Sequence, residues 1–599
     1  MCGITGYIGP EESAAILEAG LSNLEYRGYD SAGVALVGDD LAVSKQQGTI
    51  DGLTLPRDVD ATHGIGHTRW STHGEPTDAN AHPHTDCSGD VAVVHNGIIA
   101  NYTDLKAELD GHLFESDTDT EVVPHLIEAE LAQGVSFRTA VVRALTQLEG
   151  SFAIAATHVD HDGIVAARQD SPLVIGHGDD AMYLGSDVTA FVEHTRQVSY
   201  LEDGDIAHLT DDGVTVFHDG ERVTRPVQTV EWDAAAAGKA GHDHYMHKEI
   251  HEQPTALRQA ISGRFDTLGS EPTLDVSLDD RYLQAVDAIH IVACGTSYHA
   301  GLYAQGLLES LVDVPVRVEI ASQYEVRAGH DPRRTLVLAV TQSGETADTL
   351  AALRRAKAAG MTTFAVTNTV GSTVTREVDD ALFIKAGPEI GVAATKTFVS
   401  QVTALALFVV YLGRLRGTIT ADASANILAH IQQLPTAVQS ILDVESQLRR
   451  LAQEYTDSEA FFFIGRDLAT PVALESALKL KEISYAHAEG FAAGELKHGP
   501  LALVTPETPV VALLTAHSAT EDTRNNVKEV ESRGAPVIGL VTEGTDAPFC
   551  THTITISPLG RFEPLVANVA TQLFAYHVAD ALGRPIDKPR NLAKSVTVE

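Results

Sequence analysis

Cysteine is scarce in this sequence, which has four among 599 residues: Cys2, Cys87, Cys294 and Cys550. They stand far apart and match neither a disulfide framework nor the close spacing of a metal-ligand motif. Long apolar runs are also missing, since none reaches about 18 residues, and no basic segment with an apolar core opens the chain. These absences predict a protein of a reducing, cytoplasmic compartment, with no membrane as partner.

Basic residues are few, because 42 Lys and Arg stand against 82 Asp and Glu, for a net charge of −40. So negative a surface repels nucleic acid and anionic membranes. The acidic residues are dispersed rather than gathered in a tail, a pattern that indicates adaptation to high salt, where screening removes the self-repulsion. A site for an anionic substrate must therefore be built locally from backbone N–H groups, hydroxyls and a few cations.

The first 220 residues combine short strands with interspersed helices. Strands are expected at residues 4–8, 32–37, 63–67, 91–95, 152–157 and 164–168, and helices at 14–23, 121–133 and 136–148. This arrangement predicts an α+β or layered sandwich. Three polar clusters, at residues 66–74, 95–99 and 116–121, interrupt the pattern where strands end.

Each cluster has an ordinary structural interpretation. Asn96-Gly97 is a common pair for a two-residue hairpin turn, and residues 116–121 contain candidates for a helix cap. Arg69 alone is typical of a surface ion pair. The alternative is that all three clusters complete a reaction centred on Cys2.

Cys2 becomes the first residue once Met1 is removed, and it then carries a thiol beside a free α-amine. An α-amine titrates with a pKa of about 7.7–8 and can act as general base for its own side chain. Attack on a carboxamide needs an oxyanion hole, for which the Asn96 side chain and the Gly97 backbone N–H are two donors. An incidental cysteine in a buried first strand is the alternative.

Cys2-Gly3-Ile4 and the three clusters resemble the class II (N-terminal nucleophile) glutamine amidotransferase domain over roughly residues 2–220. That family folds as a four-layer α/β/β/α sandwich and hydrolyses glutamine to glutamate and ammonia. The resemblance implies Cys2 as nucleophile and base, and Asn96 and Gly97 as the oxyanion hole. The residues that it implies for glutamine binding are Arg69, Trp70, His73 and Asp119, with Trp70 as a gate.

Residues 221–285 are interpreted as a linker and a connecting helix. Residues 233–244 are small and polar, and a helix is expected within 244–254. His247 and His251 stand one helical turn apart, which is compatible with metal ligands. No further ligand is evident in the sequence, so a connecting helix is preferred and no metal site is predicted.

From residue 286 apolar strands alternate with long helices. A strand from residue 288 precedes a helix from about Tyr298, and a strand from residue 336 precedes a helix at 348–357. Continuous apolar strands with helical crossovers predict a parallel, doubly wound sheet. The unit recurs with strands from residues 460 and 510, so two subdomains are predicted, at 286–425 and 455–590.

Polar side chains follow the strands of the first copy at helix N-termini. They are Thr296, Ser297, Thr341, Gln342, Ser343 and Thr346. Hydroxyls and backbone N–H groups at the carboxyl edge of a parallel sheet suit a phosphate group without Lys or Arg; helix capping alone is the alternative. The second copy has Arg466-Asp467 and Ala516-His517 instead, so a phosphate site is predicted in the first copy only.

The repeated unit resembles the sugar isomerase (SIS) fold, and the whole chain resembles the family of glutamine-dependent enzymes that aminate fructose 6-phosphate. The matching segments are 294–297, 342–346, 391–396, 494–500 and the tail 591–599. The resemblance implies Glu482 as proton carrier between sugar carbons C1 and C2, Lys479 as stabiliser of the enediol, His498 in ring opening, Lys594 as Schiff-base lysine, and Val392, Ala393 and Ala593 as lining residues. Otherwise Lys479 and Glu482 form a solvated helical ion pair. Thr341 departs from the Ser of many members but keeps the hydroxyl.

The reaction implied is D-fructose 6-phosphate plus L-glutamine to D-glucosamine 6-phosphate plus L-glutamate, the first step of amino-sugar biosynthesis. Ammonia passes internally, no metal or organic cofactor is required, and a homodimer is expected from the resemblance. One alternative is an amidotransferase with another sugar-phosphate acceptor. The other is a non-catalytic sugar-phosphate sensor, against which Glu482, His498 and Lys594 argue because binding alone needs none of them.

Overall fold

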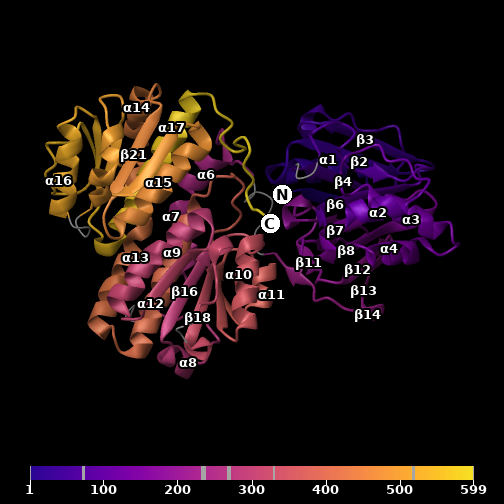
Figure 1. The fold of residues 1–599 in the computed structure, drawn as a ribbon, viewed down its shortest axis with the longest axis horizontal. Coiled ribbons are helices and arrows are strands. Elements are labelled where there is room, and N and C mark those ends of the chain that lie inside the picture. Colours follow the sequence, from indigo (N-terminus) through magenta and orange to yellow (C-terminus); the bar gives the residue numbers. More distant parts are fainter. Residues whose placement is uncertain are drawn as a thin grey trace. The chain divides into compact units, whose positions relative to one another are not determined.

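The computed structural model describes residues 2–70, 74–230, 238–265, 271–327, 331–515 and 520–597. Contacts divide the chain into two compact units (Figure 1): Met1–Gly238 with Ala593–Glu599, and Lys239–Leu592. The first unit is built on two antiparallel sheets and the second on two parallel sheets.

Both sheets of the first unit consist of short antiparallel strands. In spatial order the eight-stranded sheet contains β15 (Gln228–Thr229), β11 (Gln197–Tyr200), β9 (Val174–His177), β10 (Met182–Gly185), β1 (Gly3–Ile8), β4 (His63–Arg69), β2 (Ser31–Val37) and β3 (Leu41–Gln47). The seven-stranded sheet contains β14 (Glu221–Val223), β13 (Gly213–His218), β12 (Asp205–Thr210), β8 (His161–Gln169), β7 (Gly150–His158), β6 (Val91–Ile99) and β5 (His84–Thr85).

The two sheets stack through a shared apolar core, to which the first contributes Ile4 and Ile65 and the second Val94 and Ala155. Further apolar clusters join each sheet to helices on its outer face. The helices of this unit are α1 (Ser13–Leu24) on the first sheet, with α2 (Tyr102–Glu108), α3 (Val122–Leu131) and α4 (Phe137–Leu145) on the second. The predicted four-layer α/β/β/α sandwich is confirmed.

The second unit repeats one parallel sheet. The first copy runs in the order β17 (Val316–Ile320), β16 (Ala288–Ala293), β18 (Thr335–Val340), β19 (Thr362–Thr367) and β20 (Asp380–Phe383). The second runs β22 (His487–Ala492), β21 (Ala460–Gly465), β23 (Val510–Leu514), β24 (Val537–Thr542) and β25 (His552–Ile556). Each has the 2-1-3-4-5 order of a doubly wound fold, which confirms the predicted duplication.

Helices cover both faces of these sheets, since alternate residues of a strand point to opposite sides. In β18, Leu336 and Leu338 pack in the cluster of α9 (Gly295–Leu311) and α12 (Lys396–Arg416), whereas Val337 and Ala339 pack against α10 (Ala347–Ala358). The helices are α6 (Tyr245–His251), α7 (Gln253–Ile261), α8 (Asp280–Ala285), α9 (Gly295–Leu311), α10 (Ala347–Ala358), α11 (Thr373–Glu377), α12 (Lys396–Arg416), α13 (Ala421–Leu442), α14 (Glu445–Glu454), α15 (Ala469–Ser484), α16 (Thr520–Glu531) and α17 (Glu563–Ala581).

Two details of the helices bear on the predictions. Helix α9 begins at Gly295 rather than near Tyr298, because Gly295 adopts a φ of +52° and turns the chain directly from strand to helix. Helix α12 is long and apolar enough to cross a membrane, but 83% of its apolar window is buried, as in the core helix of a globular domain.

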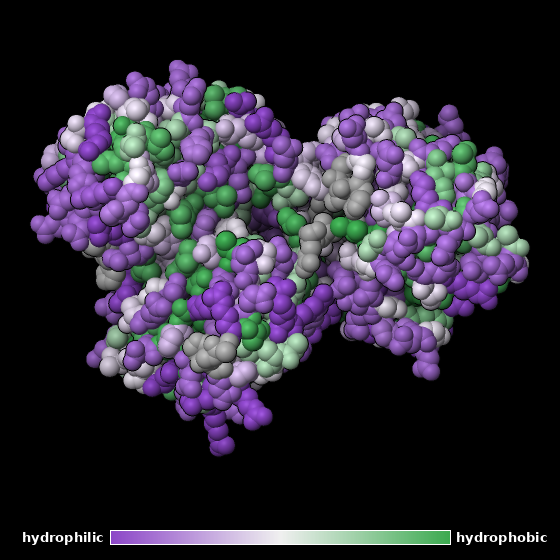
Figure 2. Space-filling model, in the orientation of Figure 1, coloured by the Kyte–Doolittle hydropathy of each residue, from purple (hydrophilic) through white to green (hydrophobic). Residues whose placement is uncertain are grey.

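The surface view in Figure 2 is dominated by hydrophilic residues, in keeping with the net charge of −40. We expect the melting temperature to rise as KCl is raised from about 0.1 M to about 2 M, because the Debye length falls from about 10 Å to below about 3 Å and self-repulsion is screened. Thermal unfolding followed by circular dichroism measures this shift. An unchanged or falling melting temperature across the series would show that repulsion does not limit stability.

Candidate functional site

Cys2 lies beside the chain that follows β4. It directly precedes β1, and Gly3 of β1 pairs with Thr68 of the antiparallel β4. This register brings the Cys2 thiol to Trp70, whose backbone N–H donates to Cys2 Sγ at 3.3 Å. Trp70 in turn packs edge-on against Tyr29, with ring centroids 5.6 Å apart. Strand pairing therefore joins two segments that the sequence separates widely.

Asn96 and Gly97 lie inside β6, so the interpretation of this pair as a hairpin turn is wrong. The Asn96 amide Nδ2 donates to the Cys2 carbonyl at 3.0 Å, which places it beside the thiol-bearing residue. Gly97 has a φ of +133°, and a Cβ there would lie 2.0 Å from the carbonyl oxygen of Ser151. Only glycine fits this backbone, because any side chain there would collide with the backbone of β7.

Arg69 is buried, with 3% of its surface exposed, so a surface ion pair is ruled out. Burial lowers the pKa of the guanidinium, while the charges of Cys2, Asp30 and Asp119 act to raise it. Asp119 is also buried, and its Oδ2 accepts the backbone N–H of Ile99 at 2.8 Å. The predicted cation and anion for an amino acid therefore lie close to Cys2 and β6.

The structure departs from two other expectations in this region. Helix α3 begins after Glu121 without a side-chain cap, because the Glu121 carboxylate instead accepts the backbone N–H groups of Glu115 and Ser116. His73, predicted to bind glutamine, lies outside the described residues.

Three further polar side chains surround this centre. Arg27 and Asp30 were missed in the sequence, whereas His67 belongs to the polar cluster at residues 66–74 but was given no role. Arg27 Nε donates to the Cys2 carbonyl at 3.4 Å, and Asp30 interacts with Arg69. His67 Nε2 lies 3.1 Å from Asn96 Oδ1 and 3.0 Å from the His95 carbonyl, so its N–H orients the Asn96 amide. For Arg27 and Asp30, the sequence signal was the charged run at residues 25–30, which directly precedes an apolar strand.

Buried histidines make the first unit sensitive to acid. Burial lowers the pKa of His67 to about 3, and those of His82 and His84 are lowered well below their usual value. Because unfolding lets these groups take up protons near pH 6.5, their stabilisation is complete above that pH and is lost as the pH falls toward 3. At about pH 5, His67 alone removes about 2 kcal/mol from the free energy of unfolding.

Urea unfolding at a series of pH values, followed by tyrosine and tryptophan fluorescence, measures this loss. His67→Gln keeps a hydrogen-bond donor to Asn96 and should flatten the slope between about pH 6.5 and pH 4. A slope as steep as that of the native protein would contradict a neutral buried His67.

The second candidate centre joins the two copies of the repeat. Thr296, in the first turn of α9, donates to Glu475 Oε1 at 2.9 Å and accepts from Lys479 Nζ at 3.1 Å. Lys479 also lies 2.7 Å from Glu482 Oε2. Three predicted residues from both copies thus meet, together with Glu475, which was missed although it lies one turn before Lys479 on the same helix face.

Lys479 and Glu475 are both fully buried, so a solvated helical ion pair is the wrong description. Burial acts to lower the pKa of Lys479, but Glu475 and Glu482 outweigh it and raise that pKa. The lysine therefore remains a cation at physiological pH. Glu475 also binds His299 Nδ1 at 2.7 Å, which completes a buried charge network.

The predicted phosphate-binding side chains follow the neighbouring strands β16 and β18 at their carboxyl ends. Ser297 Oγ accepts from Gln401 Nε2 at 3.0 Å, which leaves its proton free to orient toward a ligand. Thr341 Oγ1 accepts the Gly344 N–H at 3.2 Å and lies 3.4 Å from Thr346 Oγ1. The hydroxyl of Thr341 thus lies within the turn at the end of β18, where the Ser of many family members would place its own hydroxyl.

Gln342 and Ser343 complete this turn. The Gln342 carbonyl accepts the Asn368 N–H at 3.1 Å, and Ser343 Oγ accepts the Glu345 N–H at 3.2 Å. These bonds tie the turn to the chain after β19 and to the start of α10. On the second copy, Ala516 and His517 lie outside the described residues.

The segment that contains Val392 and Ala393 is held by two acidic residues, one in α6 and one within the segment itself. Glu249 accepts the backbone N–H of Gly391 at 3.2 Å, and Glu389 accepts those of Thr395 and Thr397 at 2.9 and 3.0 Å. The expected connecting helix therefore also positions a segment predicted to line the sugar site. Both Val392 and Ala393 are buried.

His498, Ala593 and Lys594 lie in less regular segments. His498 is exposed and ends a 3-10 turn, Ala493–His498. Ala593 and Lys594 are half-buried, and their segment is grouped with the first unit. Their roles at a sugar remain predictions.

His247 and His251 have more neighbours than the sequence indicated. Glu445 accepts from both, at 2.8 and 3.1 Å, and lies 2.9 Å from His577 Nε2. These histidines hold the pKa of Glu445 far below its usual range, so it stays ionised. The carboxylate is saturated by imidazoles, which makes this an ion-paired junction between α6, α14 and α17.

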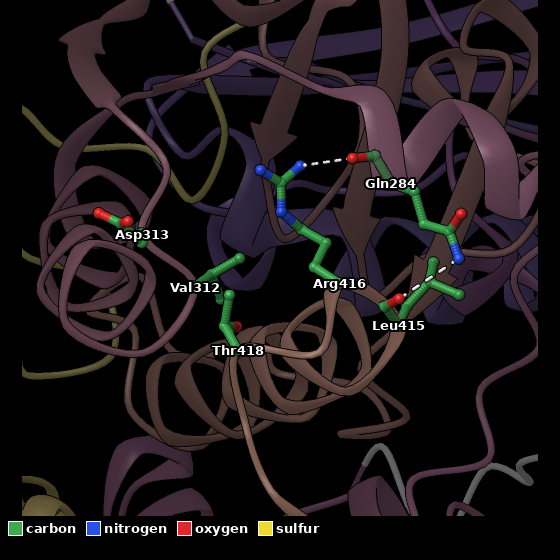
Figure 3. A pocket seen from close by; sticks show the side chains of 6 residues that line it. All are labelled: Gln284, Val312, Asp313, Leu415, Arg416 and Thr418. Atoms are coloured by element: carbon green, nitrogen blue, oxygen red, sulfur yellow. Dashed lines mark hydrogen bonds between the residues drawn. The ribbon is translucent and has the colours of Figure 1, made fainter.

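A polar pocket near the start of β16 is unrelated to these centres (Figure 3). It is lined by Gln284, Val312, Asp313, Leu415, Arg416 and Thr418. The Arg416 guanidinium donates to the carbonyls of Gln284 and Val286 at 3.1 and 2.7 Å, and Gln284 Nε2 donates to the Leu415 carbonyl at 3.3 Å. Arg416 therefore closes the end of α8.

Family models match the same parts of the chain. The glutamine amidotransferase domain matches residues 67–193, and the SIS domain matches residues 282–411 and 454–580. Fold and sites together define a glutamine amidotransferase domain joined to two SIS domains.

Relatives match over the full length. A glutamine–fructose-6-phosphate aminotransferase (isomerizing) from Halobacterium salinarum is 63% identical over 601 residues, with 100% of both chains covered. Relatives of the same name from Symbiobacterium thermophilum and Methanosarcina mazei are 49% and 44% identical, again over 100% of both chains. The C-terminal domain of glucosamine-fructose-6-phosphate aminotransferase from Francisella tularensis aligns with a TM-score of 0.56 and 37% identity, covering 59% of this chain and 99% of that chain. The chain belongs to the family of glutamine–fructose-6-phosphate aminotransferases (isomerizing).

Proposed function

We propose that this enzyme converts D-fructose 6-phosphate and L-glutamine to D-glucosamine 6-phosphate and L-glutamate, as the names of its relatives indicate. The observation that carries the proposal is the hydrogen bond from Lys479 to Thr296 at 3.1 Å. It joins the helix with the predicted proton carrier Glu482 to the strand end predicted to bind phosphate. A sugar phosphate held by the first copy would thus meet acid–base groups of the second.

In the first step, the Cys2 thiolate attacks the carboxamide carbon of glutamine, with the α-amine of Cys2 as base once Met1 is removed. Asn96 Nδ2 and the Gly97 N–H stabilise the oxyanion, while Arg69 and Asp119 hold the carboxylate and ammonium groups. Ammonia leaves, and water hydrolyses the thioester to glutamate. His73 and the gate Trp70 complete this site by the family resemblance.

In the second step, the phosphate lies on the hydroxyls of the first copy and His498 assists ring opening. Lys594 holds the open-chain ketose as a Schiff base at C2, and ammonia replaces the lysine nitrogen. Glu482 then moves a proton from C1 to C2, and the proton of the C1 hydroxyl passes to the imine nitrogen, which leaves an aldehyde at C1 and an amine at C2. Lys479, kept protonated by its carboxylate neighbours, stabilises the negative charge that develops on the enediol oxygen.

The proposal includes a cytoplasmic homodimer that binds neither nucleic acid nor membrane. It rests on the acidic surface and on the family resemblance.

Simultaneous assay of glutamate and glucosamine 6-phosphate tests the proposed function. We expect both products only when both substrates are present, in equal amounts. If glutamate is released at the same rate with and without fructose 6-phosphate, and no amino sugar forms, the proposed function is wrong.

A further inference from the structure

Four side chains with metal-binding atoms converge in the first unit, away from Cys2. They are Cys87 in the turn between β5 and β6, His112 after α2, and His125 and Glu128 on α3. One ligand atom of each lies within 4.8 Å of all the others. Their sequence separations fit no metal motif, so they could not be grouped before the fold was known.

Four of the six separations between the ligand atoms are close to those of a tetrahedral zinc site. Zinc bonds of about 2.3 Å to sulfur and about 2.05 Å to nitrogen place these ligand atoms about 3.6 Å apart at tetrahedral angles. Cys87 Sγ lies 3.7 Å from His112 Nδ1 and 3.6 Å from His125 Nδ1. Glu128 Oε2 lies 3.0 and 3.4 Å from the same two nitrogens, near the spacing of about 3.3 Å expected for two short zinc bonds.

The surroundings hold these ligands in place. The Asp86 carboxylate accepts the N–H groups of Asp90 and Val91 at 2.8 and 2.9 Å and so shapes the turn that carries Cys87. The Leu113 N–H donates to Cys87 Sγ at 3.4 Å and so holds the sulfur in place. The other ring nitrogen of His125, Nε2, is buried and lies 4.0 Å from the carboxylate of Glu121, beyond hydrogen-bond distance.

We propose that Cys87, His112, His125 and Glu128 bind one zinc ion. Thiolate and imidazole ligands select zinc over magnesium or calcium, which prefer oxygen. Four protein ligands close the tetrahedron and leave no position for substrate, so the ion is structural. Cys87 is exposed, which gives the metal access from solvent.

The site would fix the segment that carries Asp119. His112 precedes residues 113–124 and His125 follows them, so the ion ties both ends of this segment to each other and to the turn at Cys87. Asp119 within it binds the Ile99 N–H of β6. The ion thus positions the predicted ammonium ligand of glutamine, a part of the inference that rests on the proposed function.

Zinc content tests the site independently of activity. The protein is produced without a histidine tag in zinc-supplemented medium, dialysed, and analysed by mass spectrometry of its metals. We expect about one zinc per chain in the native protein and in the control Cys550→Ser, and below about a tenth in Cys87→Ser and His125→Ala. A native protein without zinc, or a Cys87→Ser variant with as much zinc as the native protein, overturns the site.

Cobalt gives a second readout if a variant folds poorly. Native protein stripped by a chelator and supplied with Co²⁺ should develop a thiolate charge-transfer band. If this band does not appear, the four side chains form a metal-free hydrogen-bonded cluster and the proposal is overturned.

The positioning role has its own test. Zinc-free enzyme should show a KM for glutamine about tenfold higher, while isomerisation of fructose 6-phosphate stays within about twofold. An unchanged KM in zinc-free enzyme overturns the positioning role and leaves zinc content to decide the site itself. Failure of the proposed function is recognised separately, because the zinc-loaded enzyme would then form no amino sugar.

Discussion

Replacement of Cys2 by alanine is expected to abolish glutamine-dependent formation of glucosamine 6-phosphate, with a loss of about 10³-fold or more. The variant loses the only atom that can form the thioester, whereas the neighbouring Asn96 and Arg69 stay in place. Isomerisation of fructose 6-phosphate should continue within about twofold of the native rate. The measurement compares glutamate release with formation of glucose 6-phosphate in the same preparation.

Cys550→Ala is the matched control, because Cys550 is a partly buried cysteine in the other unit. It should leave both activities unchanged. Loss of both activities in a Cys2→Ala variant that still melts like the native protein would contradict two separate sites.

Glu482→Gln is expected to have the second large effect, a loss of about 10²–10⁴-fold in isomerisation and amino-sugar formation. The glutamine side chain at position 482 has the same shape as glutamate, but it cannot take the proton from C1 of the sugar. Lys479 keeps a buried carboxylate partner in Glu475 at 3.4 Å, so the fold should persist. Hydrolysis of glutamine to glutamate should survive the change.

Hydrogen exchange at C1 of the sugar in heavy water separates a proton carrier from a structural residue. Glu482→Gln should lose this exchange, while Glu459→Gln, an exposed glutamate just before β21, should keep it. Exchange at the native rate in Glu482→Gln would remove this residue from the proton transfer.

The two folds could be predicted because each leaves a local signal. Alternating strands with interspersed helices indicated the layered sandwich, and apolar strands followed by polar helix starts indicated the doubled parallel sheet. The roles suggested for Lys479 and Glu482 came from a matching segment, and the structure adds their burial and their contact with Thr296.

Contacts made by strand pairing were not predictable. Arg27 and His67 reach Cys2 and Asn96 because β1 pairs with β4 and because the sheet that contains β6 stacks on theirs. A single sequence specifies neither which strands pair nor which sheets stack. Glu475 was within reach, since its one-turn spacing from Lys479 is a helical signal. The grouping of Cys87 with His112 and His125 depends on three segments that only the folded chain brings together.

The amide nitrogen of glutamine is expected to become the amino group of the sugar. Glutamine labelled with ¹⁵N at the amide, supplied with fructose 6-phosphate and unlabelled ammonium in excess, tests it by mass spectrometry of the product. We expect glucosamine 6-phosphate that carries the label, in an amount equal to the glutamate released. Labelled ammonium in solution with an unlabelled sugar, or with no amino sugar, would contradict it.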